Sequence, residues 1–269
     1  MPTRREHPMR FRLLSWNIHK GIGGLDGRYD IQRTIRAIER CHPDIVHLQE
    51  VDDDAPRSRH HRQVDVLADA LDMPHRAYQP NVTLRRGAYG NAIISRFPLN
   101  LLRSLDLTIP FKKRRGAQIV SAAIPVPHQL HQPVMLVNLH LGLIEFEQKM
   151  QLRRLLACEE VKGLDHHIPM IVAGDMNDML GRLGRHVLEP REFRSASNGK
   201  STFPAFFPMR ALDQIFYRGG VSLRRCFIPR TELIRQASDH LPLVADFEVA
   251  VKHGHGHAAH AQAKHKVEG

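Results

Sequence analysis

An α/β layered fold is the architecture that this sequence predicts, and three observations predict it. Apolar, strand-like runs recur along the chain and alternate with segments that have amphipathic helical spacing. At 269 residues the chain is long for one domain, yet no repeat or linker divides residues 10–250 into two cores. The hydrophobic fraction of 42% and charged fraction of 25% are typical of a folded globular chain. We therefore expect mixed sheets with helices outside them.

The first third of the chain predicts strands and helices in alternation. Phe11–Ile18 and Asp44–Leu48 are apolar runs of strand length. Ile31–Cys41 has isoleucines at helical spacing on one face, and Asp30 stands where an N-cap is expected. Val64–Leu71 is a shorter helical pattern. This region therefore predicts two helices that each follow a strand.

The remainder predicts eight more strands and one long helix. The strand-like runs, separated by turn residues, are Ala88–Ser95, Leu99–Leu107, Ala117–Ile124, Val134–Leu141, Ile168–Ala173, Ala211–Tyr217, Val221–Ile228 and Leu243–Val249. Glu145–Val161 is the longest helical pattern. Residues 251–269 are rich in histidine and poor in bulky apolar residues, which is typical of a flexible tail or a tract that binds transition metals.

The chain is strongly basic. Lysine and arginine number 39 against 28 aspartates and glutamates, which gives a formal net charge of +11. The basic runs include residues 57–62 and 112–115, well before the tail. Such a surface attracts nucleic acids, anionic lipid surfaces or phosphorylated small molecules, although it is also compatible with a solvated surface that has no specific partner.

The cysteines and the hydropathy pattern bear on the compartment. Cys41, Cys158 and Cys226 are widely spaced and odd in number, which argues against a disulfide framework and fits a reducing compartment. No apolar run is long enough to span a bilayer, and no apolar signal core follows the basic N-terminus. We expect a cytoplasmic monomer without a transmembrane segment.

Three polar residues beside strand-like runs are candidates for a metal site. Asn17 ends the first run, Glu50 follows the second, and Asp239 precedes the last. Their amide and carboxylate oxygens are ligands that Mg²⁺ or Mn²⁺ accepts. In isolation, Glu50 is more typical of a solvated surface acid and Asn17 of a turn residue. The neighbouring Asp52–Asp54 is more typical of a solvated turn.

Asp175 and Asn177 follow another strand and stand two residues apart, so both are expected to face one site. A carboxylate there orients or deprotonates a water, and an amide holds that water or a phosphate oxygen. His140 ends a further strand, where an imidazolium would stabilise a pentacovalent phosphate. A satisfied core histidine is the alternative interpretation of His140.

Asp213 is an acid within a strand-like run, and a buried acid needs a partner. His240 is available for that purpose. An Asp–His pair orients the imidazole and raises its pKa, which suits a phosphate-binding cation or a general acid–base.

Seven short motifs carry a family resemblance. They are Trp16-Asn17-Ile18-His19-Lys20-Gly21, Leu48-Gln49-Glu50, Tyr89-Gly90-Asn91-Ala92-Ile93, Asn138-Leu139-His140-Leu141, Gly174-Asp175-Met176-Asn177, Leu212-Asp213-Gln214-Ile215 and Ser238-Asp239-His240-Leu241-Pro242-Leu243. In this order they resemble the endonuclease/exonuclease/phosphatase superfamily, over about residues 10–249. The basic pair before Gly116 resembles uncharacterised bacterial members.

The resemblance implies a deoxyribonuclease I-like four-layer α/β sandwich, made of two mixed β-sheets flanked by helices. It implies a hydrolase that cleaves phosphodiesters in line with the help of Mg²⁺, or alternatively Mn²⁺. The implied roles are catalysis by Asp175, Asn177, His140, Asp213 and His240, metal binding by Asn17, Glu50 and Asp239, and substrate binding by Asn91, Asn138 and Arg115.

Two substrate classes remain open. The basic body favours a nucleic acid and therefore a nuclease. The apolar segment Phe203-Pro204-Ala205-Phe206-Phe207-Pro208 favours a phospholipid or sphingomyelin headgroup, unless it forms a buried wall beside the site. A catalytically silent basic binding protein is the alternative of a different kind, and the complete set of chemical groups argues against it.

Overall fold

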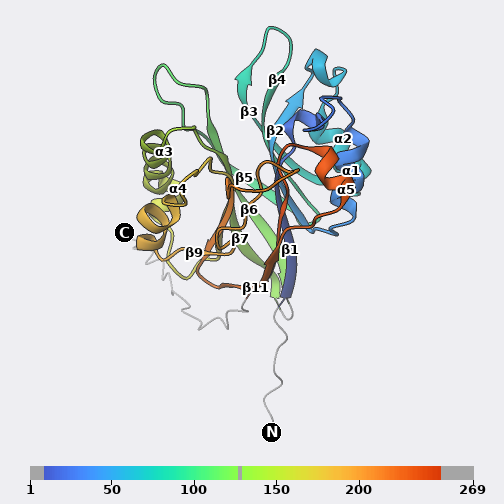
Figure 1. The fold of residues 1–269 in the computed structure, drawn as a ribbon. Coiled ribbons are helices and arrows are strands. Elements are labelled where there is room, and N and C mark those ends of the chain that lie inside the picture. The colour runs from blue at the N-terminus through green and yellow to red at the C-terminus, as the bar shows by residue number, and fades with distance from the viewer. Residues whose placement is uncertain (1–8, 127–128, 250–269) are drawn as a thin grey trace, which may run out of the picture.

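The computed structural model describes residues 9–126 and 129–249 and consists of two β-sheets packed face to face with helices on their outer faces (Figure 1). This four-layer arrangement confirms the predicted fold class. The expected tail, residues 251–269, lies outside the described residues. No helix within the described ranges is long and apolar enough to cross a membrane.

The first sheet has the strand order β11-β12-β1-β2-β4-β3. Its strands are β1 (Met9–Asn17), β2 (Ile45–Asp53), β3 (His75–Thr83), β4 (Ala88–Ser95), β11 (Val221–Phe227) and β12 (Leu243–Val249). Only β1 and β2 run parallel; the other neighbours are antiparallel. Three helices cover its outer face: α1 (Ile31–Glu39), α2 (Gln63–Ala70) and α5 (Glu232–Ala237).

The second sheet has the order β5-β6-β7-β8-β10-β9. Its strands are β5 (Leu99–Asp106), β6 (Gly116–Val126), β7 (Gln129–His140), β8 (Met170–Asp175), β9 (Arg194–Ser195) and β10 (Asp213–Arg218). Only β7 and β8 are parallel, and the crossover between them holds α3 (Glu145–Ala157) and α4 (Glu159–Lys162). The short segments η1 (His19–Gly21), η2 (Pro56–Ser58), η3 (Gly184–Leu188) and η4 (Glu189–Arg191) complete the elements.

Three apolar clusters hold the layers together. One joins the first sheet to α1, α2 and α5, and another joins the second sheet to α3, α4 and η3. The third fills the space between the sheets, where alternate residues of each strand meet. Phe247 lies there with its ring centroid 5.7 Å from that of Phe11 and 5.5 Å from that of Tyr217. The site is positioned where the apolar filling between the sheets gives way to polar residues.

Several elements differ from their predicted form. The long helix expected over Glu145–Val161 is broken at Cys158, whose φ of −69° and ψ of 153° are extended. Asp52 belongs to β2, is fully buried and pairs with Arg57, so the solvated turn expected there is wrong for this residue. Strand β3 and helix α5 were not predicted.

The Asp30 cap of α1 is confirmed, since its Oδ1 accepts from the Gln32 amide at 3.0 Å, and all three cysteines are free, as expected.

Candidate functional site

Strand pairing in the second sheet brings three of the predicted residues together. Parallel pairing of β7 with β8 sets His140 opposite Asp175, and antiparallel pairing of β8 with β10 sets Asp213 opposite Asp175. The residue before Asp175 must be a glycine, because a Cβ at Gly174 would lie 1.9 Å from the Leu139 carbonyl oxygen. The close approach of β7 and β8 thus explains the Gly-Asp motif.

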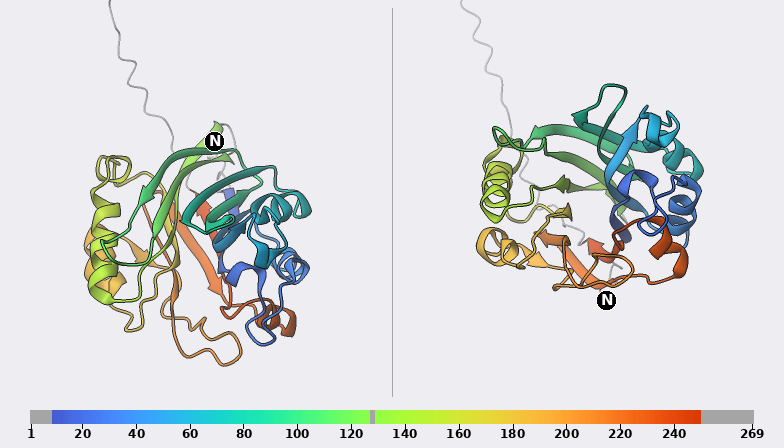
Figure 2. Two further views of the ribbon diagram at one scale, coloured as in Figure 1. Left: turned by 90° about the horizontal axis from the view of Figure 1, so that it is seen from above. Right: turned by 45° about the horizontal axis from the view of Figure 1, so that its top comes forward.

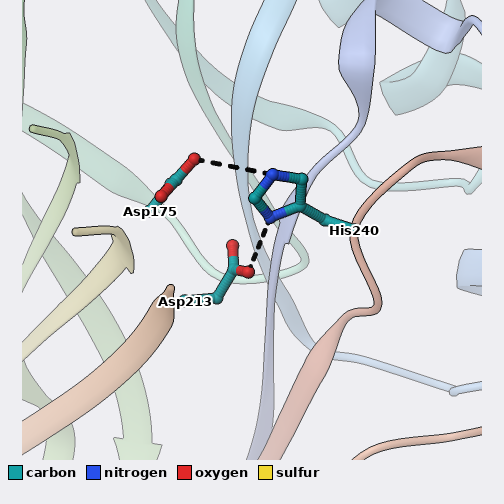
Figure 3. A group of neighbouring side chains, drawn as sticks. All are labelled: Asp175, Asp213 and His240. Carbon is teal, nitrogen blue, oxygen red and sulfur yellow. Dashed lines mark hydrogen bonds and ion pairs between the residues drawn. The ribbon is translucent and has the colours of Figure 1, made fainter. Parts of the chain in front are cut away.

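The Asp175 carboxylate is the hub of the site. Its Oδ2 accepts a hydrogen bond from Asn17 Nδ2 at 3.0 Å, and His140 Nε2 lies 3.4 Å away. Its Oδ1 accepts from the backbone N–H of Asn177 at 3.0 Å. His240 Nε2 approaches the same Oδ2 at 3.9 Å (Figure 3). Side chains from both sheets therefore converge on one buried carboxylate.

The predicted Asp213–His240 pair is present in the geometry. His240 Nδ1 lies 2.8 Å from Asp213 Oδ2, which also accepts from the Thr202 hydroxyl (Figure 3). The His240 backbone is fixed as well, because Trp16 Nε1 donates to its carbonyl oxygen at 2.8 Å. The imidazole is thus held with Nε2 turned to Asp175.

The charges of His240 and Asp175 follow from their surroundings. Burial alone would lower the pKa of His240, but the Asp213 and Asp175 carboxylates raise it to about 10. Burial raises the pKa of Asp175 to about 6, although the His240 charge and the hydrogen bonds from Asn17 and Asn177 oppose it. At neutral pH His240 is therefore a cation beside a carboxylate that is a stronger base than a free aspartate.

His140 differs from expectation. Burial and the nearby Arg115 charge hold its pKa well below the ordinary histidine value. Both effects favour the neutral imidazole over the imidazolium expected at this position, because the guanidinium already supplies positive charge and burial penalises a second cation. Its ring is suited to hydrogen bonding rather than to charge neutralisation.

A β-bulge positions Glu50. The register between β2 and β4 shifts between Leu48 and Val51, and both of these residues pack into the helix-side cluster. Two residues thus occupy the space of one, and Glu50 has a φ of 56°. Its carboxylate pairs with Lys20 Nζ.

Glu50 stays ionised. Burial alone would raise the pKa of Glu50, but positive charge at His140 and Lys20 lowers it to about 2. The ammonium groups of Lys20 and Lys113 favour the ionised form of Glu50 even when His140 is neutral. A carboxylate that is paired with one lysine among the described residues is available to a metal cation.

Asp239, the third predicted metal ligand, immediately precedes His240 in the chain. Its Oδ1 is 3.8 Å from His19 Nδ1 and 3.3 Å from the Ser238 hydroxyl, and about a third of its side chain is exposed. Gly24 packs closely on it, since a Cβ there would meet the Asp239 Cα at 2.6 Å. The loop after β1 thus borders Asp239.

One set of described residues lies close enough together to hold a metal, and the predicted set has suitable ligand chemistry. The ligand atoms of Asp175, Asp213 and His240 all lie within 4.8 Å of one another. In this set, however, His240 Nδ1 and Asp213 already bind each other. The predicted set of Asn17, Glu50 and Asp239 offers only oxygen ligands, one of them from a carboxylate with a depressed pKa. That chemistry fits Mg²⁺ or Mn²⁺ better.

The three residues predicted to bind substrate lie in different environments. Asn138 is fully buried; its Nδ2 donates to the Leu48 and Ala92 carbonyl oxygens, and its Oδ1 accepts from Gln49. This geometry supports a role in joining the sheets rather than contact with substrate. Asn91 is also fully buried and donates to the Gly116 carbonyl oxygen at 3.0 Å.

Arg115 is the third residue that was predicted to bind substrate. Its side chain is 95% buried, and no described residue bonds to its Nε. Burial lowers its pKa, while the nearby carboxylates of Asp175 and Glu50 favour the charge. A buried guanidinium with an unused donor is a strong candidate for binding an anion such as phosphate.

Some supporting residues carried no clear sequence signal. Thr202 donates to Asp213, and Gln148 Nε2 donates to the carbonyl oxygens of both Gly142 and Asn177. The lysine of the Asn-Ile-His-Lys motif was visible, but nothing in the pattern indicated that it pairs with Glu50. Only the fold reveals such contacts.

Comparisons with known proteins show what the chain is similar to. Residues 14–240 match the model of the Endonuclease/Exonuclease/phosphatase family. "Uncharacterized protein YbhP" of Escherichia coli K12 is 29% identical over 255 residues, which cover 89% of this chain and 96% of that protein.

Solved structures share the fold. An endonuclease/exonuclease/phosphatase from Beutenbergia cavernae superposes with a TM-score of 0.74 at 24% identity, covering 89% of this chain and 72% of the other. TDP2 of D. rerio, complexed with a single-stranded DNA product, has a TM-score of 0.64 at 18% identity and covers 88% and 98%. The human Nocturnin catalytic domain, with bound sulfate, has a TM-score of 0.66 at 20% identity and covers 92% and 96%.

Proposed function

The chain belongs to the endonuclease/exonuclease/phosphatase family, and from this premise we propose that it is a metal-dependent phosphodiesterase. The observation that carries the proposal is the convergence of Asn17, His140 and His240 on Asp175. A basic carboxylate beside a fixed imidazolium is suited to hydrolysis at phosphorus.

The proposed reaction uses water as the nucleophile. Asp175 accepts the water proton as the new P–O bond forms, because its pKa is raised and its Oδ2 is oriented by Asn17. His240 Nε2 donates a proton to the leaving oxygen as the old P–O bond breaks, while Asp213 holds Nδ1. Arg115 binds a non-bridging phosphate oxygen.

Asn17, Glu50 and Asp239 are the residues that we propose to hold Mg²⁺. A bound divalent cation would supply positive charge to the phosphate oxygens. Lys20 pairs with Glu50 beside these residues. Mn²⁺ is the alternative cofactor, because oxygen ligands accept it equally well.

The surface supports two substrate classes. Nucleic acid is favoured by the net charge of +11 and by three cations around the Tyr89 ring: Arg57 at 5.1 Å and Lys20 and Lys113 at 5.8 Å each. A lipid phosphodiester is favoured by Phe206 and Phe207, which are exposed rather than buried as a wall beside the site.

The mechanism predicts the effect of replacing Asp175. With bis(p-nitrophenyl) phosphate and Mg²⁺, Asp175→Ala should lower kcat by about 10²–10⁴-fold, because the water loses its general base. EDTA should abolish turnover of the unchanged chain, and Mg²⁺ should restore it. Steady-state kinetics measures both effects.

Asp69→Ala, which removes an exposed carboxylate on α2, is the matched control and should leave kcat unchanged. Circular dichroism should show that both variants are folded. Unchanged turnover by folded Asp175→Ala, or turnover that resists EDTA, would contradict the mechanism.

A further inference from the structure

The face that carries the site is bordered by exposed apolar side chains. Apart from Leu101 and Leu102 on β5, every exposed large apolar side chain of the described ranges lies in a segment that borders the site or on the adjoining helix α3. Monomeric proteins rarely gather apolar side chains in this way unless the patch binds something. The distribution therefore points to a binding surface.

The segment 203–210 contributes the most prominent part. Its Ala205 N–H donates to the Asp239 carbonyl oxygen at 2.7 Å, and the Phe203 ring lies 4.9 Å from the His240 ring. Beyond these anchors, Phe206 is 65% exposed, Phe207 67% and Met209 61%. The segment is thus fixed to the site at its base while its apolar tip faces solvent.

Two further segments extend the patch. Leu143 and Phe146 follow His140 and are 69% and 71% exposed. Leu180 follows Asn177 and is 59% exposed. Gln148 ties the two segments together through the Gly142 and Asn177 carbonyl oxygens, so they form one continuous border.

Cations lie in two further segments of this border. Arg85 and Arg86 lie in the turn between β3 and β4, and Lys112 and Arg114 lie in the connection before β6; all four are exposed. In the right-hand view of Figure 2 these hairpins, α3 and the segment near residue 205 surround the same open end of the two sheets. The site is therefore bordered by exposed apolar and cationic side chains together, and both kinds occur in the connection before β6, where Phe111 precedes Lys112.

This combination fits a lipid surface better than a nucleic acid. Phe206 and Phe207 have rings on which bases can stack, but Leu143, Leu180 and Met209 have none, and their exposure adds nothing to the binding of a polyanion. A bilayer accepts apolar side chains below its headgroups and attracts cations when it contains anionic lipids.

We propose that this face docks on an anionic phospholipid bilayer and presents the site to a phosphodiester in a lipid headgroup. The proposal rests on the proposed phosphodiesterase function and names its substrate class. Phe206 and Phe207 insert among the lipids, while Arg85 and Arg86 contact the headgroup phosphates.

Vesicle co-sedimentation tests the docking. The full chain should bind vesicles of phosphatidylcholine mixed with phosphatidylglycerol more tightly than vesicles of phosphatidylcholine alone. The double variant Phe206→Ser/Phe207→Ser should bind the mixed vesicles at least about tenfold more weakly, because two aromatic side chains no longer leave water. Arg85→Gln/Arg86→Gln should weaken binding to the mixed vesicles only.

Leu101→Ser/Leu102→Ser is the matched control. It removes two exposed apolar side chains near the start of β5, outside the proposed docking surface, and should leave vesicle binding unchanged. Equal binding by the full chain and the Phe206→Ser/Phe207→Ser variant would overturn the proposal. The proposal would also be overturned if light scattering showed a dimer that the Phe206→Ser/Phe207→Ser variant no longer forms. The same holds if this variant bound plasmid DNA more weakly than the unchanged chain.

A soluble substrate separates the two proposals. The Phe206→Ser/Phe207→Ser variant should hydrolyse bis(p-nitrophenyl) phosphate at the rate of the unchanged chain and lose activity only on phospholipid in vesicles. Hydrolysis of the soluble diester without vesicle binding would overturn the docking and leave the phosphodiesterase function standing. Vesicle binding without hydrolysis of any diester would support the docking and contradict the phosphodiesterase function.

Discussion

Four residues of the site or its border have a backbone conformation that non-glycine residues rarely adopt. The φ angles are 47° for His19, 62° for Lys20, 56° for Glu50 and 49° for Asn177. Such conformations cost about 1–3 kcal/mol each in strained cases and persist where the surrounding structure holds them. Here they direct the Lys20–Glu50 pair and the backbone N–H of Asn177 towards the site. Local backbone strain therefore accompanies the positioning of these polar groups.

His47 links a buried residue to the pH dependence of stability. Burial lowers the pKa of His47 to about 3, and neither ring nitrogen has a partner among the described residues. An unfolded histidine titrates near pH 6.5, so the unfolded state binds a proton that the folded state excludes. The stability due to neutral His47 is therefore complete above about pH 6.5 and is lost as the pH falls towards 3.

We expect the free energy of unfolding to fall by up to about 1.4 kcal/mol per pH unit below 6.5 through this residue. His47→Leu should remove that part of the slope, and urea unfolding between pH 4.5 and 7.5 measures it. His131→Leu, at an exposed histidine of β7, should keep the slope of the unchanged chain. A slope that survives in His47→Leu would contradict this account.

At the scale of elements, periodicity predicted most strands but not their irregularities. Strand β3 contains Pro80 and pairs on one side only, at the sheet edge, so its pattern is weak. Helix α5 has six residues, too few for a visible period. The break at Cys158 and the bulge at Glu50 depend on packing and register, which a single sequence does not display.

Asn138 shows how one element can join two sheets. From β7 its amide bonds to the carbonyl oxygens of Leu48 in β2 and Ala92 in β4, and to the side chain of Gln49. Asn138→Ala would leave these groups buried and unpaired, so we expect a loss of about 2–4 kcal/mol in unfolding free energy. Denaturant unfolding measures the loss.

The same variant tests the prediction that Asn138 binds substrate. If the residue only joins the sheets, KM for bis(p-nitrophenyl) phosphate should stay unchanged in the folded variant. A raised KM with unchanged stability would instead favour substrate contact. Asn100→Ala, at an exposed asparagine of β5, should change neither quantity.

At the scale of the molecule, the chain order explains how several of the predicted site residues come together. The chain builds β1 to β4 in one sheet and β5 to β10 in the other, then returns to the first with β11 and β12. Parallel pairing of β7 with β8 brings His140 and Asp175 together at the ends of their strands. The return also places His240 beside Asp213. Contacts made by loops, such as Lys20 with Glu50, required the folded chain.

This order also predicts that the two sheets unfold together, because neither the first sheet nor the core between them is complete until β12 is in place. Phe247 of β12 packs between the sheets against Phe11 and Tyr217. Phe247→Ala should lower the unfolding free energy by about 3–5 kcal/mol. Its transition should stay single, since the loss affects the core that both sheets share.

The single tryptophan supplies the measurement. Trp16 lies in the cluster between the first sheet and its helices, so its fluorescence reports on that layer, whereas far-ultraviolet circular dichroism reports on both sheets. In Phe247→Ala the two signals should shift to lower denaturant by the same amount. Phe207→Ala, at a phenylalanine that is 67% exposed, should move neither by more than about 0.5 kcal/mol. Separate transitions in Phe247→Ala would mean that the sheets are independent units, and the site between them would then depend on their docking.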